Sequence, residues 1–126
     1  MARRDFSGKV ILITGAAGGL GAALCHQFAA AGAHIAAMDL DATRLQDLVA
    51  ALPAGTLSIA GNIADPAACQ AAIDQTVAHF GALDGLINNA GISHRSLFLD
   101  TDPAVIRRVM EVNFFGAMQM THAALP

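Results

Sequence analysis

The residues that point most clearly to chemistry are four glycines and one acid in the first third of the chain. Gly15, Gly18, Gly19 and Gly21 follow a short apolar run, and Asp39 comes about 20 positions later. Glycines let a backbone approach a pyrophosphate, and the amino end of the next helix offers free N–H groups to it. An acid after the second strand accepts ribose hydroxyls. The pattern predicts a dinucleotide site; the alternative is an ordinary βαβ crossover rich in Gly and Ala.

The glycine spacing separates this turn from two other nucleotide loops. The fingerprint G-x-G-x-x-G, read from Gly19, would need a glycine where the chain has Leu24. The phosphate loop G-x-x-x-x-G-K-[ST] needs a lysine, and Lys9 is the only lysine in the sequence. The pattern is instead T-G-x-x-x-G-x-G over residues 14–21. We expect the backbone N–H groups around Leu20 to face the pyrophosphate.

The elements that must position these residues alternate along the chain. We expect strands over 10–14, 34–39, 56–60 and 84–88, and helices over 19–31, 42–51, 66–80 and 103–122. Asp65-Pro66 and Asp102-Pro103 each place a capping acid before a proline at the first helical position. Alternation with short connections predicts an α/β fold with a parallel sheet. Right-handed crossovers give the strand order 3-2-1-4, in which the fourth strand is an edge.

Four segments in this order resemble the short-chain dehydrogenase/reductase family. They are residues 14–21, Asn62-Ile63-Ala64-Asp65 after the third strand, Asn88-Asn89-Ala90-Gly91 after the fourth, and Val112-Asn113-Phe114-Phe115-Gly116 in the last helix. The resemblance covers essentially the whole chain. It implies a Rossmann-type doubly wound parallel sheet, and one NAD-binding domain over residues 1–126 that is truncated at its carboxyl end.

The resemblance also implies roles for residues after the third and fourth strands. The family usually has Asp where this chain has Asn62, accepting from the adenine amino group, and an amide oxygen can also accept. Asn62 and Ile63 are therefore candidate adenine contacts, with a simple turn as the alternative. Asn89, Ala90 and Gly91 would line the ribose on the nicotinamide side and brace the sheet, although Asn-rich turns also occur without a ligand.

Asn113 is the one residue that matches the family's catalytic set. In the family a Ser and a Tyr-x-x-x-Lys follow the helix that contains this Asn, but the sequence has no Tyr, and Lys9 precedes the first strand. Asn113 shares a helix face with Val109 and Gly116, so we expect it to be substantially buried. The resemblance gives it a water in a proton relay; the alternative, equally weighted, is a core Asn bonded to the backbone.

Asp39 favours NAD over NADP, because a carboxylate accepts both ribose hydroxyls and repels a 2′-phosphate. The positions where NADP users of the family typically carry a basic residue hold Ala17 and Leu40. Arg44 lies nearby, but on the second helix it is expected to be solvated. The resemblance implies an NAD-dependent oxidoreductase for a small alcohol or carbonyl substrate, present as its cofactor-binding half and inactive by itself. The alternative is a non-catalytic dinucleotide-binding module or pseudoenzyme subunit.

Composition restricts the partners. A net charge of −3 and a pI near 5.8 leave no basic stripe for nucleic acid. Charged residues make up 13% of the chain, about half the usual share, and the mean hydropathy is +0.51. We therefore expect apolar surfaces, such as the Met and Phe residues of the last helix, to need a cover in a homo-oligomer or with another partner.

Two further features bear on location and metals. Residues 10–38 contain no Asp, Glu, Lys or Arg, but the glycines in their middle argue against a membrane helix, and two buried strands explain the run equally well. With no signal peptide pattern at the amino end, we expect a cytoplasmic protein in which Cys25 and Cys69 are buried thiols. No two histidines have metal-ligand spacing with a carboxylate between them, so no metal site is predicted.

Overall fold

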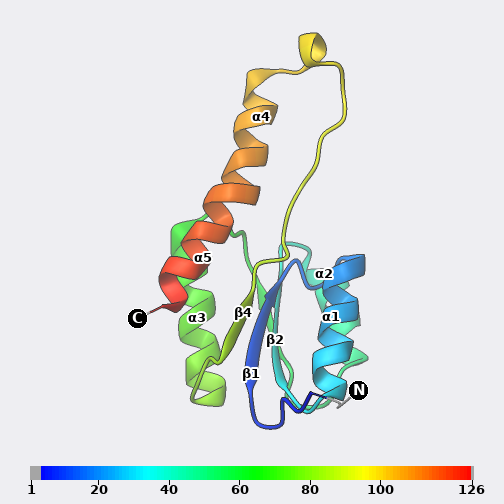
Figure 1. Ribbon diagram of the computed structural model, residues 1–126, viewed down its shortest axis with the longest axis vertical. Helices are drawn as coiled ribbons and strands as arrows, with labels where there is room; N and C mark the ends of the chain where they lie inside the picture. Colours follow the sequence, from blue (N-terminus) through cyan, green and yellow to red (C-terminus); the bar gives the residue numbers. More distant parts are fainter. Residues whose placement is uncertain (1–3, 126) are drawn as a thin grey trace.

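A computed structural model describes residues 4–125, and residues 1–3 and 126 of the predicted domain lie outside the described part. A parallel sheet of four strands lies between two layers of helices (Figure 1). The strands are β1 (Val10–Thr14), β2 (His34–Asp39), β3 (Leu57–Ala60) and β4 (Gly85–Ile87). The first three helices are α1 (Gly19–Ala30), α2 (Ala42–Ala50) and α3 (Pro66–Phe80). The strand order β3-β2-β1-β4, parallel throughout, confirms the predicted Rossmann-type topology.

Apolar residues on both faces of β1 create two cores. Ile11 and Ile13 pack with α1 and α2 through residues such as Leu45, whereas Leu12 faces the opposite side and packs toward α3 and Met120. All five residues of β1 are buried, which a strand covered by helices on both faces requires. Cys25 and Cys69 are buried, one in each core, as predicted from the sequence.

Helix starts follow the acid–proline pairs of the sequence. Asp65 Oδ1 accepts from Ala67 N at 3.0 Å, and Asp102 Oδ1 accepts from Ala104 N at 2.8 Å. In each case proline occupies the first helical position, where no N–H donor is needed. These local rules place both helix starts, at Pro66 and Pro103, where the sequence predicts them.

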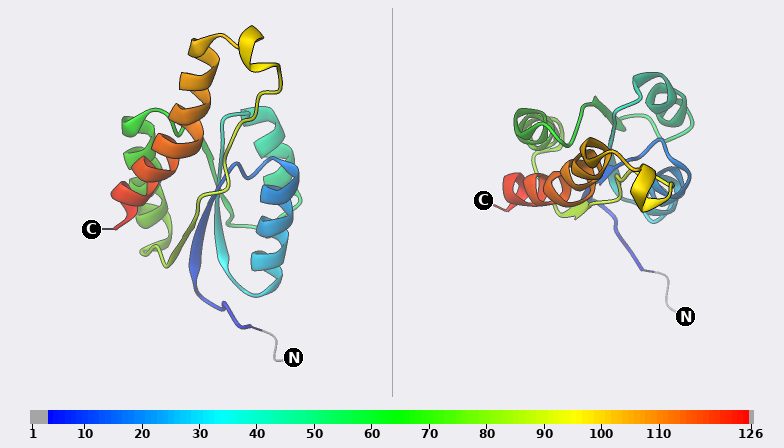
Figure 2. Two further views of the ribbon diagram at one scale, coloured as in Figure 1. Left: turned by 45° about the horizontal axis from the view of Figure 1, so that its top comes forward. Right: turned by 90° about the horizontal axis from the view of Figure 1, so that it is seen from above.

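The last helical segment is less regular than the sequence predicts. The expected helix over 103–122 comprises α4 (Pro103–Met110), a π-helical stretch η2 (Glu111–Gly116) and α5 (Ala117–Ala124), after a short 3-10 turn η1 (Phe98–Asp100). Figure 2 shows this helix leaning over the carboxyl ends of the strands, with its first half rising beyond the sheet. π-helical turns inside α-helices are frequent at functional sites, and this one carries Asn113.

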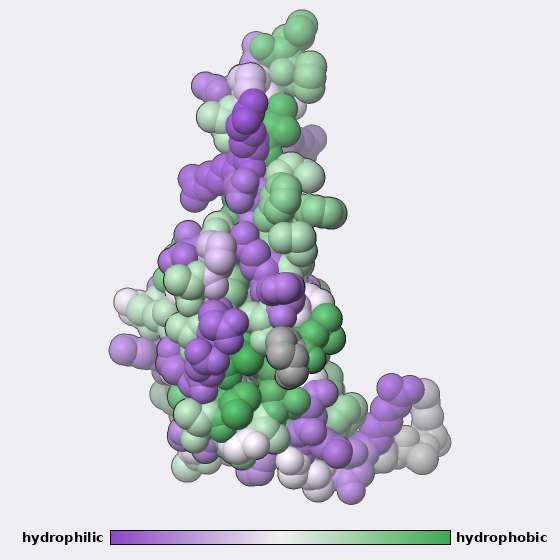
Figure 3. All heavy atoms as spheres, turned by 90° about the vertical axis from the view of Figure 1, so that its left-hand side faces the viewer, coloured by the Kyte–Doolittle hydropathy of each residue, from purple (hydrophilic) through white to green (hydrophobic). Residues whose placement is uncertain are grey.

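The rising helix is poorly covered. No residue of α4 is buried, and along the segment only Gly116 and Met120 are. Figure 3 shows hydrophobic side chains on the part of the molecule that projects above the sheet. Across residues 4–125, no helix has both the length and the apolar character needed to cross a membrane.

Candidate functional site

The turn after β1 is held by backbone contacts that only glycine permits. Gly15 has φ +62°, and a Cβ on it would lie 2.7 Å from Ala90 Cα. A Cβ on Gly21 would lie 2.0 Å from the carbonyl oxygen of Gly15, so the start of α1 packs directly on the turn. Gly19 is different, because a Cβ there would meet no atom within 4 Å. Its side is open to a ligand.

The amino end of α1 is uncapped. Gly18 is the N-cap residue, no side chain accepts from the first-turn N–H groups, and Leu20 is largely exposed. Free N–H groups at a helix start, with the positive end of the helix dipole, bind anions. The backbone of the turn is therefore accessible to a ligand and is not covered by side chains, as a pyrophosphate site requires.

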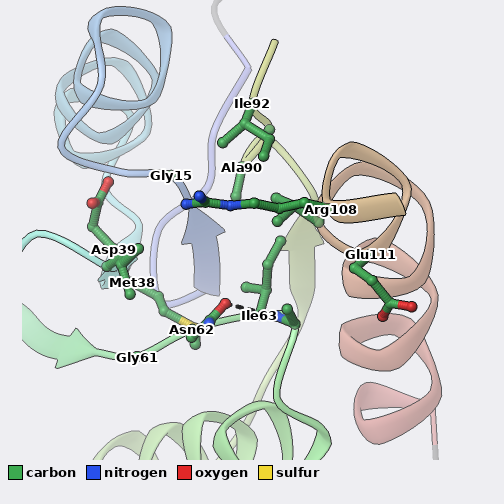
Figure 4. A pocket seen from close by; sticks show the side chains of 14 residues that line it. Gly15, Met38, Asp39, Gly61, Asn62, Ile63, Ala90, Ile92, Arg108 and Glu111 are labelled. Atoms are coloured by element: carbon green, nitrogen blue, oxygen red, sulfur yellow. Dashed lines mark hydrogen bonds between the residues drawn. The ribbon is translucent and has the colours of Figure 1, made fainter. Parts of the chain in front are cut away.

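Asp39 lies beside this turn. Its Oδ2 accepts from Ala17 N and its Oδ1 from Asp41 N, both at 2.9 Å. The first bond ties the carboxyl end of β2 to the glycine turn, and the carboxylate lines the same cavity as Gly15 (Figure 4). The predicted pairing of turn and acid is thus a direct contact.

Thr14 and Asn89 brace the turn from the other side. The Thr14 hydroxyl accepts from Asn89 N at 3.1 Å and from Ala90 N at 3.0 Å. Asn89 Nδ2 donates to the carbonyl oxygens of Thr14 and Gly15, at 3.1 and 3.2 Å. Asn89 therefore has the bracing part of its predicted role. Thr14 was not among the predicted site residues; its position directly before Gly15 was the available signal.

A cavity of about 420 Å³ opens at the carboxyl ends of all four strands (Figure 4). Its wall contains six predicted site residues, namely Gly15, Asp39, Asn62, Ile63, Ala90 and Gly91. Eight further lining residues were not predicted as site residues, namely Met38, Leu40, Gly61, Ala64, Ile92, Arg108, Glu111 and Val112. The wall does not include the other six predicted site residues, namely Gly18, Gly19, Leu20, Gly21, Asn89 and Asn113. The volume falls within the range of small-molecule sites, and the position is where open α/β sheets bind ligands.

Asn113 corrects one prediction. It is exposed rather than substantially buried, because the helix that carries it projects from the sheet. Its Oδ1 accepts from Ile92 N and its Nδ2 donates to Ile92 O, both at 2.8 Å. The amide thus fastens the segment after β4 to the π-helical turn, as the backbone-bonded alternative expected, though without the core environment. Gly91 fits beneath it, since a Cβ there would lie 3.3 Å from Asn113 Oδ1.

Comparison with known proteins settles the lineage of this site. The family model described as short chain dehydrogenase matches residues 9–126. The chain belongs to the short-chain dehydrogenase family.

Relatives within the family are similar over nearly the whole chain. "Short chain dehydrogenase/reductase dpmpG" of Macrophomina phaseolina (strain MS6) is 42% identical over 96% of this chain and 72% of its own length. "Dehydrogenase/reductase SDR family member 7B" of Bos taurus is 40% identical over 93% of this chain, but over only 39% of the bovine protein. The chain therefore spans about two fifths of this relative's length.

A solved structure of a reductase has the same fold. The 3-ketoacyl-(acyl-carrier-protein) reductase from Brucella melitensis, complexed with NADH, matches with a TM-score of 0.94 and 32% identity. The match covers 97% of this chain and 50% of the reductase chain.

Within the short-chain dehydrogenase framework, Asn62 is bound more locally than expected. It is exposed, and its Oδ1 accepts from Ala64 N at 2.9 Å, which closes the turn after β3. That oxygen retains a second lone pair for a ligand donor. Ile63 is buried at the cavity wall, where it packs on Gly116 of the helix. The turn-forming alternative is therefore realised, and the adenine role remains a prediction.

The two cysteine thiols lie in the cores, away from the cavity. Burial raises the pKa of the Cys25 thiol to about 11, and burial, with the nearby Asp65 carboxylate, raises the pKa of the Cys69 thiol. Over residues 4–125, no three His, Cys, Asp or Glu side chains gather closely enough to hold a metal ion.

Proposed function

We propose that the chain binds NAD as the cofactor-binding part of a short-chain dehydrogenase that oxidises an alcohol or reduces a carbonyl compound. The observation that carries this proposal is the bond from Ala17 N to Asp39 Oδ2, which joins the uncapped glycine turn and an acid at one cavity. The open space at Gly19 fits a ligand that approaches the backbone closely. The bound NADH of the Brucella reductase supports the same cofactor class.

The preference for NAD over NADP rests on charge. The Asp39 carboxylate would accept ribose hydroxyls and repel a 2′-phosphate dianion. Neither Ala17 in the turn nor Leu40 after β2 offers a compensating positive charge. Both Asp39 oxygens already accept backbone N–H groups, which fixes the carboxylate in place while leaving lone pairs for the ribose.

In the reaction, NAD would exchange a hydride with the substrate carbon. Residues of this chain would bind and orient the dinucleotide, and Asn113 would hold the loop after β4 against the helix through its two bonds to Ile92. The family's Tyr acid/base has no counterpart in the sequence, so we expect little or no turnover from this chain alone. Asn89, Ala90 and Gly91 would border the nicotinamide ribose.

A second candidate is a non-catalytic dinucleotide-binding module or pseudoenzyme subunit, favoured by Asn113, whose amide oxygen and amide nitrogen are both bonded to the backbone of Ile92. It shares the cofactor prediction and differs in the chemistry. NAD reduction with a panel of small alcohols separates the two: turnover by the chain, alone or with an added partner chain, supports the enzyme. Binding without turnover under any of these conditions supports the module.

The cofactor proposal is tested by calorimetric titration of the chain with NAD and with NADP. Asp39→Ala should weaken NAD about 10- to 100-fold, since a hydrogen bond to a charged group is lost, and should change NADP far less. Asp39→Asn, which keeps an acceptor oxygen, checks that the turn still folds. Asp47→Ala, an exposed acid on α2, removes the same charge and should change neither affinity. Equal losses for both dinucleotides would refute the NAD assignment.

A further inference from the structure

The cofactor cavity has one wall that comes from the helix rather than from the strands. Arg108, Glu111 and Val112 line it opposite Asp39 and Asn62. Arg108 is the only basic residue in this wall. In Figure 4 its side chain extends from the helix across the cavity, with Asn62 and Ile63 on one side of it in this view and Ala90 and Ile92 on the other.

The guanidinium of Arg108 has no partner within the described part of the chain. Among residues 4–125, neither Asp39 nor Glu111 forms an ion pair with Arg108, and no hydrogen bond holds its side chain. Arg107, the preceding residue, is also exposed but does not line the cavity. A long, charged side chain that lies over a ligand-sized cavity without a partner is available to a ligand.

The cavity wall identifies the part of a dinucleotide that Arg108 would meet. Of the glycine turn only Gly15 contributes, so the cavity lies to the side of the expected pyrophosphate position. It is bounded instead by Asp39 and by the turn at Asn62 and Ile63. If the proposed function is correct, this is the space for adenosine.

A purine needs its two faces covered, and the wall contains no aromatic side chain to do so. Ile63 and Val112 offer apolar surface. The guanidinium of Arg108 is the only cationic planar group in the wall, and such a plane stacks on aromatic rings more readily than an ammonium does.

We propose that Arg108 is a cofactor-binding residue whose guanidinium covers one face of the adenine ring. The inference rests on the proposed function and goes beyond it, because it assigns a binding role to the helix that carries Asn113. It also assigns a ligand contact to the exposed first half of that helix, which projects beyond the sheet.

The test compares Arg108→Ala, Arg108→Lys and the matched control Arg107→Ala by titrating each with adenosine, AMP, NAD and nicotinamide mononucleotide. Circular dichroism confirms that each variant is folded, which we expect since both arginines are exposed. Arg108→Ala should weaken adenosine, AMP and NAD by one common factor, about three- to thirty-fold. Nicotinamide mononucleotide should be unaffected. Lys keeps the charge without the plane, so Arg108→Lys should stay weakened.

Each other outcome overturns the inference in a recognisable way. A loss for AMP with none for adenosine means that Arg108 contacts a phosphate. Equal losses in Arg107→Ala and Arg108→Ala mean a general charge effect. Full recovery by Arg108→Lys excludes stacking. Unchanged affinities in Arg108→Ala refute the role of Arg108 but leave the proposed function intact. Failure of the unsubstituted chain to bind adenosine, AMP or NAD refutes both.

Discussion

The sheet and the helix that stands over it are packed very differently. Every residue of β1 is buried, with Leu12 and Ile13 fully so. On the helix, Met110, Phe114 and Met118 are 46%, 57% and 50% exposed. The apolar side chains of the chain thus have two different environments. In the sheet they fill a closely packed core, and on the helix they form a surface that residues 4–125 leave uncovered.

This contrast bears on the candidate site because the cavity has walls from both regions. The strand-end wall is fixed by backbone bonds such as Ala17 N to Asp39 Oδ2. The helix wall is fastened through the π-helical stretch and α5, where Asn113 bonds to Ile92, Gly116 packs on Ile63 and Met120 is buried in the core with α3. We therefore expect the strand-end wall to be rigid. We expect the helix wall to be steadied by whatever covers its apolar face, such as a second copy of the chain.

The largest effect on stability should come from Gly21→Ala, which tests how closely the sheet region is packed. The added Cβ would sit 2.0 Å from the Gly15 carbonyl oxygen, a backbone atom that cannot move alone. We expect a loss of stability above about 3 kcal/mol, the upper end for overpacking, measured by urea denaturation.

Gly19→Ala is the matched control, because a Cβ there meets nothing within 4 Å. It should leave stability nearly unchanged and weaken NAD binding, since the methyl group would occupy the open side of the turn. Equal destabilisation by the two substitutions would contradict the close-packing account.

A direct comparison of the two regions uses Leu12→Ala and Met118→Ala. Leu12 is fully buried in the core beneath α3, so its truncation should cost about 3 kcal/mol in the free energy of unfolding. Met118 is half exposed and should cost less than about 0.5 kcal/mol in a monomer.

The same pair shows whether the helix face is covered in solution. If the chain associates through this face, Met118→Ala should destabilise more at high protein concentration and shift the molecular mass measured by light scattering. A large, concentration-independent cost at Met118 would contradict the contrast between the regions.

Much of the sheet region could be predicted from the sequence, because its signals are local. Alternating elements and short connections fix the strand order. The acid after β2 reaches the glycine turn because parallel neighbouring strands end at the same edge, as the bond between Asp39 and Ala17 shows. Caps such as Asp65 follow from one residue and its neighbour.

The helix region was predicted less well, because its placement depends on long-range packing. Helical periodicity identified the helix face that carries Asn113 but could not show whether another element packs on that face. The prediction that Asn113 is substantially buried was therefore wrong. Arg108 carries no motif, and it reaches the cavity only through the lean of the helix over the strands. The Thr14 hydroxyl was missed because its two donors come from more than 70 residues away.

A smaller effect is expected at the bridge between β1 and β4. Thr14→Val keeps the shape of the side chain but removes the hydroxyl that accepts from Asn89 N and Ala90 N. Part-buried N–H groups without an acceptor should cost about 2 kcal/mol. Thr14→Ser retains the hydroxyl and should recover most of this loss. If the denaturation curves of the Thr14→Val and Thr14→Ser variants coincide, the hydrogen bonds of the Thr14 hydroxyl do not stabilise the turn.

The effect that is smallest at neutral pH concerns the ionisation of a buried thiol. Burial raises the pKa of the Cys25 thiol from an ordinary value of 9.0 to about 11. Because the folded pKa is the higher one, the neutral thiol's contribution is fully present below about pH 9 and is lost as the pH rises from about 9 to 11. In a Cys69→Ala background, stability should therefore fall over this window, and Cys25→Ala should lack that part of the fall. A Cys25 that reacts with a thiol reagent at pH 8 as fast as in the unfolded chain would contradict its burial between α1 and the sheet.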